Sequence, residues 1–509
     1  MSSAAYKASV AIAIFFLTSI LVIFTILQRV QPLPFIDEVF HIPQAQKYCV
    51  DNNFSSWDNK ITTPPGLYLV SYAIIRPVGA LFGVPHAIAC SVNNLRLVNV
   101  LFSGCNFMII WAMLKSKLAV NRDSGGSLEI LLQAIAVSLF PPFFFFSFLY
   151  YTDVGSMFTI LLVQWSAMKG HHMFAAIAGF ASLWFRQTNI VWLFLTAAFC
   201  CLNITYNLIE DYQRGRKCEF FLLGFTKNFP LRECHLKNWR YCLCLLYDFT
   251  ISVLSTCGGY VLNGILFVGF LYLNEGIVLG DRSAHLPVFH VAQIPYFLSF
   301  VTFIGAPVIF TMENARHFYR LAGTTRGAIL FLLSSTSLYL ALSDRFRYVH
   351  PYLIADNRHY VFYIWRRIWS NEAYPELRTW PIPLYIFTMV SMWHSVEFVP
   401  QPVVRPSWGS PRKNTAAIAV SLRATQHVLA KLLFSLLIIV TIVPQQLLEL
   451  RYFIVPYLLW RLHLKKPSTR WTIFFELAWA LLINAATLYI FATRTIKYSD
   501  AEPHSRIIW

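Results

Sequence analysis

Long apolar segments alternate with short polar stretches along the whole chain. Each apolar segment is close to the roughly 20 residues that an α-helix needs to cross a bilayer. Thirteen segments are therefore expected to span the membrane, at about residues 8–28, 93–114, 129–149, 152–168, 172–186, 189–209, 250–273, 294–312, 327–343, 379–399, 427–444, 446–463 and 472–493. The pattern predicts an all-α polytopic membrane protein with about 12–14 membrane helices and a single membrane-embedded domain over residues 1–509.

The segment at residues 66–83 is ambiguous, because it is long enough to span but carries Arg76 and Pro77 at its centre. A central arginine costs about 2.5–3.5 kcal/mol on insertion. If this segment spanned, the basic loop at 115–128 would lie on the non-cytoplasmic side. We therefore expect an interfacial or re-entrant helix here, which makes residues 29–92 one large non-cytoplasmic loop.

With that choice, the loops rich in Lys and Arg share one face, as the positive-inside rule expects of the cytoplasm. These loops are residues 115–128, 210–249, 313–326, 400–426 and 464–471. The loops at 274–293 and 344–378 then lie on the opposite face, although the second of them carries six arginines. Either the helix count is wrong after residue 327, or these arginines bind an anion such as a phosphate headgroup.

Composition supports the membrane class and narrows the possible partners. Hydrophobic residues make up 57% of the chain and charged residues 13%, whereas soluble domains carry about 25% charged residues. The net charge of +17 lies in short loops and forms no continuous basic face, which argues against nucleic acid as a partner. The ten cysteines lack zinc-finger spacing, so neither a metal nor another cofactor is expected.

The stretch FIDEVFHIPQAQKYC sets Asp37 and Glu38 side by side, directly after the first apolar segment. A carboxylate at a membrane edge can take a proton from a sugar hydroxyl, and burial beside lipid can raise its pKa toward that task. In a helix, Asp37, His41 and Gln44 would share one face, although Pro43 favours a helix that starts at the carboxylates. Spacing alone leaves a catalytic loop and a solvated helix end as equal alternatives.

Two tight turns between apolar segments carry further candidates. Asp153 lies in the turn YYTD, where a cap for the following helix is the favoured interpretation and a sugar contact is the alternative. Arg186 and Gln187 lie in the turn RQTN. Arg186 either extends to the membrane interface or binds a phosphate.

Three later loops on the same face are also polar. An otherwise apolar loop contains Asp281, Arg282 and His285, of which the first two form a surface ion pair in the simplest interpretation. Five consecutive hydrogen-bonding side chains favour recognition of sugar and phosphate, and they are Asp356, Asn357, Arg358, His359 and Tyr360. The stretch PQQLLELRYF supplies an interhelical ion pair or a further part of the site, through Glu449, Arg451 and Tyr452.

Carboxylates, arginines and sugar-binding groups on one membrane face suit a transferase that uses lipid-phosphate substrates. They also suit a transporter of lipids or lipid-linked sugars, whose polar residues would more often lie within the spans near the midplane. Because the polar clusters of this chain lie in loops, a transferase is favoured.

Seven stretches together resemble one family, the dolichyl-phosphate-glucose-dependent alpha-1,2-glucosyltransferases of the endoplasmic reticulum. In chain order they are DEVFHIPQAQKYC, WDNKITTPPGLYLVS, FLYYTDVGSM, FRQTNIVW, GIVLGDRSAH, LIADNRHYVFYIW and VPQQLLELRYFIVPY, and Trp509 also fits. The resemblance implies a GT-C type fold that acts on the lumenal face. It implies transfer of glucose from dolichyl phosphate glucose to the diglucosylated dolichyl-diphosphate oligosaccharide, the last step of its assembly, with inversion. A mannosyl donor in the same fold is the alternative.

The resemblance also implies residue roles for an inverting step that needs no metal. A carboxylate of the first lumenal loop must take the proton of the acceptor 2-hydroxyl, and the candidates are Asp37 first and Glu38 second. Cations would stabilise the departing phosphate, and the candidates in order are Arg358, Arg186, Arg282 and Arg451, with His41 or His359. Sugar hydroxyls would be oriented by Asp153, Asn357 and Asp356.

Overall fold

The computed structural model describes residues 3–120, 126–213, 239–282, 287–346, 348–370, 374–398, 416–465, 469–498 and 505–509. Within these ranges the ordered secondary structure is helical, apart from isolated bridges such as the one between His359 and Ile508. The predicted all-α class is confirmed.

Seven helices in the described part are long and apolar enough to cross a membrane. They are α1 (Ser3–Val30), α5 (Val92–Val120), α10 (Ile190–Gln213), α11 (Trp239–Leu273), α15 (Thr325–Leu342), α19 (Ala416–Ile442) and α21 (Arg470–Thr493). Each coincides with a segment predicted from the apolar pattern. The chain is therefore a multi-pass membrane protein, as predicted.

The other six predicted segments are helical over shorter lengths. They contain α6 (Ser127–Ser138) with α7 (Pro141–Phe146), α8 (Thr152–Met168), α9 (His172–Leu183), α12 (Gln293–Ile304) with α13 (Ala306–Ile309), α18 (Ile382–Ser395) and α20 (Ile454–Leu462). Pro141 and Pro142 separate α6 from α7, because proline is tolerated only in the first turn of a helix. Gly305 lies between α12 and α13, where it is both the C-cap of the first helix and the N-cap of the second. An unbroken helix of about 20 residues is thus not found in these segments.

Shorter helices connect the long ones. They are α14 (Met312–Ala322), α16 (Pro351–Ala355) and α17 (Tyr360–Ile364), the π-helical turn η5 (Trp365–Trp369), and the 3₁₀ turns η1 (Gln187–Asn189), η4 (Asp344–Phe346), η6 (Pro375–Arg378) and η7 (Leu450–Phe453). Two of these turns, η1 and η7, carry residues that the sequence singled out. Both open directly into an apolar helix, α10 and α20.

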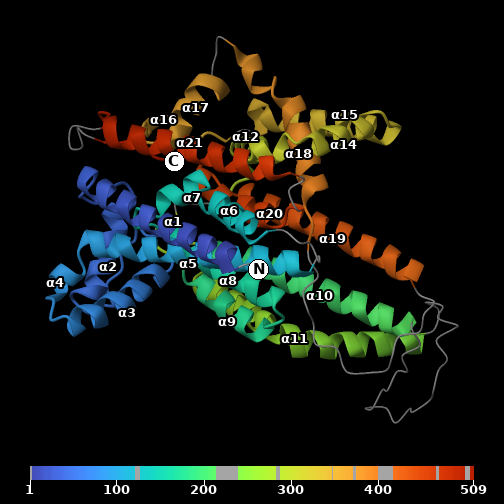
Figure 1. Ribbon diagram of the computed structural model, residues 1–509, viewed down its shortest axis with the longest axis horizontal. Helices are drawn as coiled ribbons and strands as arrows, with labels where there is room; N and C mark the ends of the chain where they lie inside the picture. The colour runs from blue at the N-terminus through green and yellow to red at the C-terminus, as the bar shows by residue number, and fades with distance from the viewer. Residues whose placement is uncertain are drawn as a thin grey trace.

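The first large loop folds into α2 (Glu38–Cys49), α3 (Gly66–Leu81) and α4 (His86–Ala89), which lie together at the lower left of Figure 1. A disulfide joins Cys49 at the end of α2 to Cys90 after α4. At 16 residues, α3 is shorter than a bilayer requires. Its first residue, Gly66, donates its N–H to the carbonyl of Trp184 at 2.7 Å. A Cβ at Gly66 would lie 2.4 Å from that oxygen, so only glycine permits this contact.

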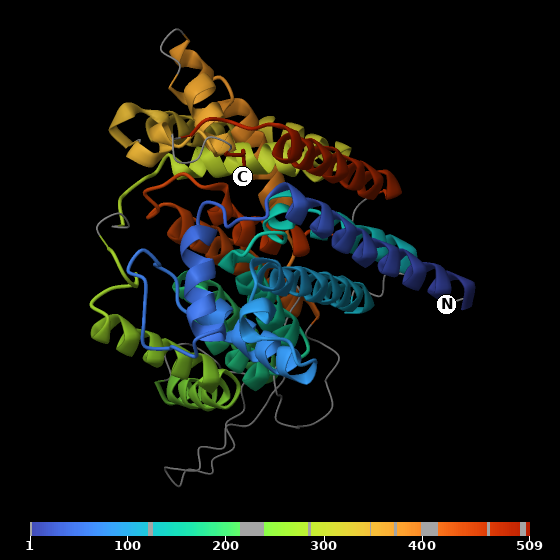
Figure 2. The same cartoon turned by 90° about the vertical axis from the view of Figure 1, so that its left-hand side faces the viewer.

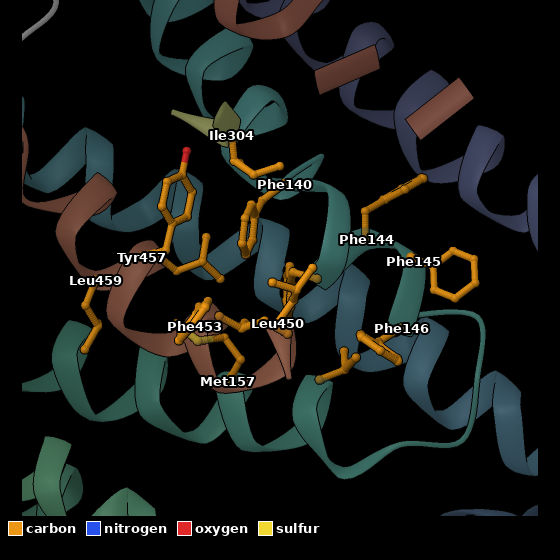
Figure 3. Close-up of a cluster of buried hydrophobic side chains, with 14 of the residues drawn as sticks. Phe140, Phe144, Phe145, Phe146, Met157, Ile304, Leu450, Phe453, Tyr457 and Leu459 are labelled. Atoms are coloured by element: carbon orange, nitrogen blue, oxygen red, sulfur yellow. The ribbon is translucent and has the colours of Figure 1, made fainter. Parts of the chain in front are cut away.

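The helices pack in two groups that meet at an aromatic core. In the first group α8 packs against α5 and α9, and α10 packs against α11 and α19; in the second, α12 packs against α18. Figure 3 shows side chains of α7, α8, α12, η7 and α20 packed in one cluster, in which Phe140, just before α7, is stacked on Tyr457 at 4.5 Å between ring centroids. In Figure 2 the blue helices of the first loop lie below the orange and red C-terminal helices and above the green α11.

The disulfide between Cys49 and Cys90 should stabilise the first loop by a measurable amount. Replacing Cys49 by Ser should lower the free energy of opening α2 and α3 by about 2–4 kcal/mol, because the open loop gains conformational freedom. Hydrogen exchange of the α2 and α3 amides measures this energy. Cys105→Ser is the matched control, because Cys105 is a free cysteine on α5. Equal exchange in the two variants would contradict the prediction.

Candidate active site

Asp37 occupies the N-cap position of α2, in the turn that leads into the helix. Its side chain makes no capping hydrogen bond. Instead, Oδ2 accepts a hydrogen bond from Arg451 Nη1 at 2.7 Å, and its backbone N–H donates to the Tyr151 hydroxyl at 3.3 Å. One third of the Asp37 side chain is exposed. The turn therefore presents a carboxylate that is held on one side and open on the other.

The expected rise in the pKa of Asp37 is wrong. Burial is the largest single influence and opposes ionisation of the carboxyl group, but the charge and hydrogen bond of Arg451, with further contributions from the neighbouring His41 and His359, together outweigh it and lower the pKa below its ordinary value. Burial could be expected from the sequence, but the contact with Arg451 could not, because Arg451 lies 414 positions away in the chain. Asp37 is thus ionised at neutral pH.

Glu38 lies beside Asp37 in the sequence but has a different environment. Its carboxylate is fully buried against Arg96 of α5, which binds it through Nε at 2.8 Å and also through Nη2. The backbone N–H groups of Tyr150 and Phe35 donate to its two oxygens, at 2.6 and 3.1 Å. Glu38 is therefore a buried and fully bonded carboxylate, in contrast to Asp37.

Arg451 connects Asp37 with Glu449. Its Nε and Nη2 atoms donate to Glu449 Oε2 at 2.9 and 2.5 Å, while Nη1 reaches Asp37. The guanidinium group also lies over the ring of Tyr151, 5.2 Å from its centroid. The neighbouring Tyr452 is close enough that the charges of Glu449 and Arg451 act on its hydroxyl. The Glu449–Arg451 pair is local to one turn rather than interhelical as predicted, and Arg451 makes its long-range contact with Asp37.

Asp153 and Arg186 form a second ion pair of the site, with 3.0 Å between Oδ1 and Nη1. The favoured interpretation of Asp153 as a helix cap is wrong, because the cap position of α8 belongs to Tyr151 and no side-chain capping bond forms. The second carboxylate oxygen, Oδ2, is buried without a hydrogen-bond partner. The charges of this pair act on His41 and Asp153 also acts on Arg451, so the two ion pairs belong to one site.

His41 lies on α2 beside Asp37 but does not supply a cation. Its Nδ1 shares a hydrogen bond with the hydroxyl of Tyr68. Burial lowers the pKa of His41 to about 4, although the charge of Asp37 opposes the change. The imidazole is therefore neutral at pH 7 and acts as a hydrogen-bonding group.

The polar run at 356–360 folds into a self-paired loop beside this site. Arg358, the first phosphate candidate, donates from Nε and Nη2 to the carboxylate of Asp356, both at 2.9 Å, and lies 3.7 Å over the ring of Tyr498. His359 donates from Nδ1 to the carbonyl of Trp509 at 3.2 Å, and its charge reaches Asp37. Asn357 donates to the carbonyl of Lys497 at 3.2 Å, while its Oδ1 is buried without a partner.

The remaining predicted residues support the backbone of the first loop. Gln44 binds the carbonyl of Ser56 at 2.7 Å and Gln187 that of Thr62 at 2.8 Å. The backbone N–H of Asp281 donates to the carbonyl of Asn59 at 2.7 Å.

Arg282 binds within its own loop, donating to the carbonyls of Asn274 and Glu275. The other predicted residue of this loop, His285, lies outside the described residues. Gln44 of α2, Gln187 of η1 and Asp281 thus all contact the segment at 56–62.

Comparison with known proteins decides the family. A model described as the DIE2/ALG10 family matches residues 31–462, which include both Asp37 and Arg451. The chain belongs to the DIE2/ALG10 family. Relatives named Dol-P-Glc:Glc(2)Man(9)GlcNAc(2)-PP-Dol alpha-1,2-glucosyltransferase match nearly the whole chain.

The human relative is 34% identical over 99% of both chains. The relative from Drosophila melanogaster is 33% identical over 93% of both, and the one from Arabidopsis thaliana is 29% identical over 95% of this chain and 96% of its own. No solved structure matches the chain significantly.

Sequence reasoning missed one charged residue of this DIE2/ALG10 site, Arg96. It lies within the predicted span at 93–114, where an arginine facing lipid would be costly. That cost was the available signal for a buried partner, which the structure identifies as Glu38. Gln28 near the end of α1 was missed for the same reason, since its side chain oxygen accepts from Arg96 Nη1 at 2.7 Å.

The low pKa of His41 predicts a pH-dependent stability. Between pH 6.5 and about 4 the unfolded chain binds a proton at His41 that the folded protein does not, so stability falls as pH decreases through this window. His41→Gln keeps a hydrogen-bonding side chain and should flatten this part of the profile. Thermal unfolding midpoints of both proteins between pH 4 and 8 (roughly the range over which histidine titrates) measure the effect. Unfolding midpoints that fall equally in the two proteins as pH decreases would contradict the prediction.

Proposed function

We propose that this protein transfers glucose from dolichyl phosphate glucose to the 2-hydroxyl of the terminal glucose of Glc(2)Man(9)GlcNAc(2)-PP-Dol, in the endoplasmic reticulum membrane. The named relatives act on this donor and acceptor and match the chain over nearly its full length. The observation that carries the mechanism is the partly exposed carboxylate of Asp37, which Arg451 holds at 2.7 Å.

Asp37 is the base in this mechanism, and Glu38 is not. A carboxylate offers about four acceptor positions, and Glu38 uses them on Arg96, Tyr150 and Phe35. It has neither a free lone pair nor a path to solvent. Asp37 has an exposed side that an incoming hydroxyl can reach.

The transfer then proceeds in one inverting step. The 2-hydroxyl oxygen of the acceptor attacks the anomeric carbon of the donor glucose as the bond from that carbon to the phosphate oxygen breaks. The hydroxyl proton passes to Asp37, and dolichyl phosphate leaves as a stable anion that needs no proton.

Arg451 and Arg186 stabilise the departing phosphate. Both are mostly buried, and each is held by a carboxylate, so their positions are set before substrate binds. A phosphate that engages Arg451 also weakens the pull of that cation on Asp37. The pKa of Asp37 then rises, which makes the carboxylate a better base when the donor is present.

Asp153 orients a sugar hydroxyl in this account. Its Oδ2 is buried and lacks a partner, and a buried acceptor without a hydrogen bond carries a free-energy cost that a substrate hydroxyl would remove.

An apolar groove beside the site accommodates a dolichyl chain. It has a volume of about 690 Å³ and lies between α10, α11 and α19, with Leu193, Ala198, Val261 and Leu433 among its lining residues. It begins at Ile190, directly after the turn that carries Arg186. A lipid chain in this groove would therefore place its phosphate near that arginine.

The Cys49–Cys90 disulfide supports a lumenal position for the first loop. Disulfides persist in oxidising compartments such as the lumen of the endoplasmic reticulum. The charge distribution of the loops gives the same orientation independently.

The base assignment predicts the effect of one substitution. Asp37→Asn should reduce glucose transfer by at least about 1,000-fold, because the carboxylate that accepts the proton is absent. Transfer is measured as a gain of one hexose in the mass of the acceptor oligosaccharide, with purified protein in nanodiscs.

The same assay tests the alternative functions. Near-full activity of Asp37→Asn would remove it from the role of base. Wild-type protein that moved lipid-linked sugar across the membrane without a hexose gain would instead be a transporter. Activity with dolichyl phosphate mannose in place of the glucose donor would assign a mannosyltransferase.

The groove predicts a dependence on the length of the donor lipid. Ala198→Trp should raise the KM for dolichyl phosphate glucose about tenfold or more, because the indole occupies space that the chain needs. For a donor with a two-isoprene chain, the KM of the variant should equal the KM of the wild type, since this short chain does not extend along the groove. Equal KM changes for both donors would contradict the assignment.

A further inference from the structure

We infer that Glu38, Arg96 and Gln28 form a positioning network whose function is to hold Asp37 in its catalytic orientation. This inference rests on the proposed function, in which Asp37 is the base. It gives the second carboxylate of the pair a role that involves no contact with substrate.

Arg96 uses its whole hydrogen-bonding capacity in this network. A guanidinium group has five N–H donors, and the structure gives Arg96 five acceptors. Nε and Nη2 bind the two oxygens of Glu38, and Nη1 binds the side chain of Gln28. The two remaining bonds reach the carbonyls of Gln31 and Leu33, at 2.6 and 2.9 Å.

The network therefore joins four separate parts of the chain. Arg96 belongs to α5, Gln28 to α1, and Gln31 and Leu33 to the connection between α1 and α2. Glu38 adds the backbone of Tyr150, which lies before α8. Neither Arg96 nor Glu38 has any side-chain exposure, so the network is closed to substrate.

The residue between this network and Asp37 has an unfavourable backbone conformation. Ile36 has a φ of +54°, in the left-handed region that β-branched residues rarely adopt. Such a conformation persists only where its surroundings fix it. Here Phe35 and Glu38, which enclose Ile36 and Asp37, are fixed because the N–H of Phe35 donates to the carboxylate of Glu38 at 3.1 Å.

The consequence is a turn that directs two adjacent carboxylates in opposite ways. Glu38 points into the protein toward Arg96, whereas Asp37 points to Arg451 and keeps one third of its side chain exposed. If the bonds of Glu38 were lost, Ile36 could relax to an ordinary conformation. Asp37 would then move away from Arg451 and from the acceptor hydroxyl.

Glu38→Gln is the first test, because it keeps the shape of the side chain and removes its charge. We expect kcat to fall about 100-fold, since a displacement of about 1 Å at a reacting group costs this much. The KM values for both lipid substrates should stay within about twofold of wild type, because binding does not involve Glu38. Purified full-length protein in nanodiscs, with radiolabelled donor, gives both constants.

Glu476→Gln is the matched control for damage to the fold. Glu476 also forms a buried pair with an arginine, Arg461, at 2.5 Å, but it lies on α21, and Arg461 is at the opposite end of α20 from Arg451. We expect this variant to lose thermal stability as Glu38→Gln does but to keep its kcat. An equal loss of kcat in the two variants would overturn the inference.

A double-mutant cycle with Asp37→Asn separates positioning from a general structural role. If Glu38 acts through Asp37, adding Glu38→Gln to Asp37→Asn should cause little further loss of residual transfer. A second loss of about 100-fold in that background would show that Glu38 acts independently and would overturn the inference.

A milder variant keeps the test usable if Glu38→Gln fails to fold. Gln28→Leu leaves the ion pair intact and removes one bond of Arg96, so a smaller loss of kcat without a KM change is expected. An unchanged kcat in a folded Gln28→Leu protein would contradict a role for Gln28. Wild-type protein without transferase activity would refute the proposed function itself, whereas an active wild type with an unaffected Glu38→Gln variant would refute only the network.

Discussion

The buried ion pair between Glu38 and Arg96 is the contact on which the geometry of the site depends. It attaches the first loop to α5 and α1, and its satisfied hydrogen bonds make the burial of two charges tolerable. Asp37 directly precedes Glu38 in the chain. Its position, and therefore its meeting with Arg451, follows from where that pair holds the turn.

Paired charges recur throughout the site, and two of the pairs join parts of the chain that are distant in sequence. Asp153 with Arg186 joins α8 to the turn before α10, and Arg451 joins the turn before α20 to the first loop. In such an arrangement the arginines are fixed before a phosphate arrives, which avoids the cost of organising them during the reaction. The same pairing lowers the pKa of Asp37. In the proposed mechanism, a substrate phosphate that competes for Arg451 would raise that pKa and make Asp37 a better base.

Much of the fold follows from hydropathy, because each membrane helix must present an apolar surface to lipid. The pattern located every long helix, and it gathered Asp37, Asp153, Arg186 and Arg451 on one face. It failed at Pro141 and Gly305, where an apolar run hides a break in the helix.

The contacts between charged side chains were harder to predict than the positions of the helices. Which arginine meets which carboxylate depends on how distant helices pack, so Asp37 could not be matched to Arg451 from spacing. Arg96 lies inside the span predicted at 93–114, where the cost of a lipid-facing arginine indicates a buried partner but does not identify that partner as Glu38. Cys49 and Cys90 both lie in the loop predicted at 29–92, although no disulfide between them was predicted.

The most direct measurement of this account is an experimental structure of the Asp37→Asn protein with dolichyl phosphate glucose and its lipid-linked acceptor bound. The account predicts that the side chain at position 37 lies within hydrogen-bond distance, about 2.6–3.2 Å, of the acceptor 2-hydroxyl. Glu38 should remain on Arg96, and Arg451 should contact the donor phosphate. An acceptor hydroxyl placed against a different carboxylate, with position 37 remote from it, would contradict the account.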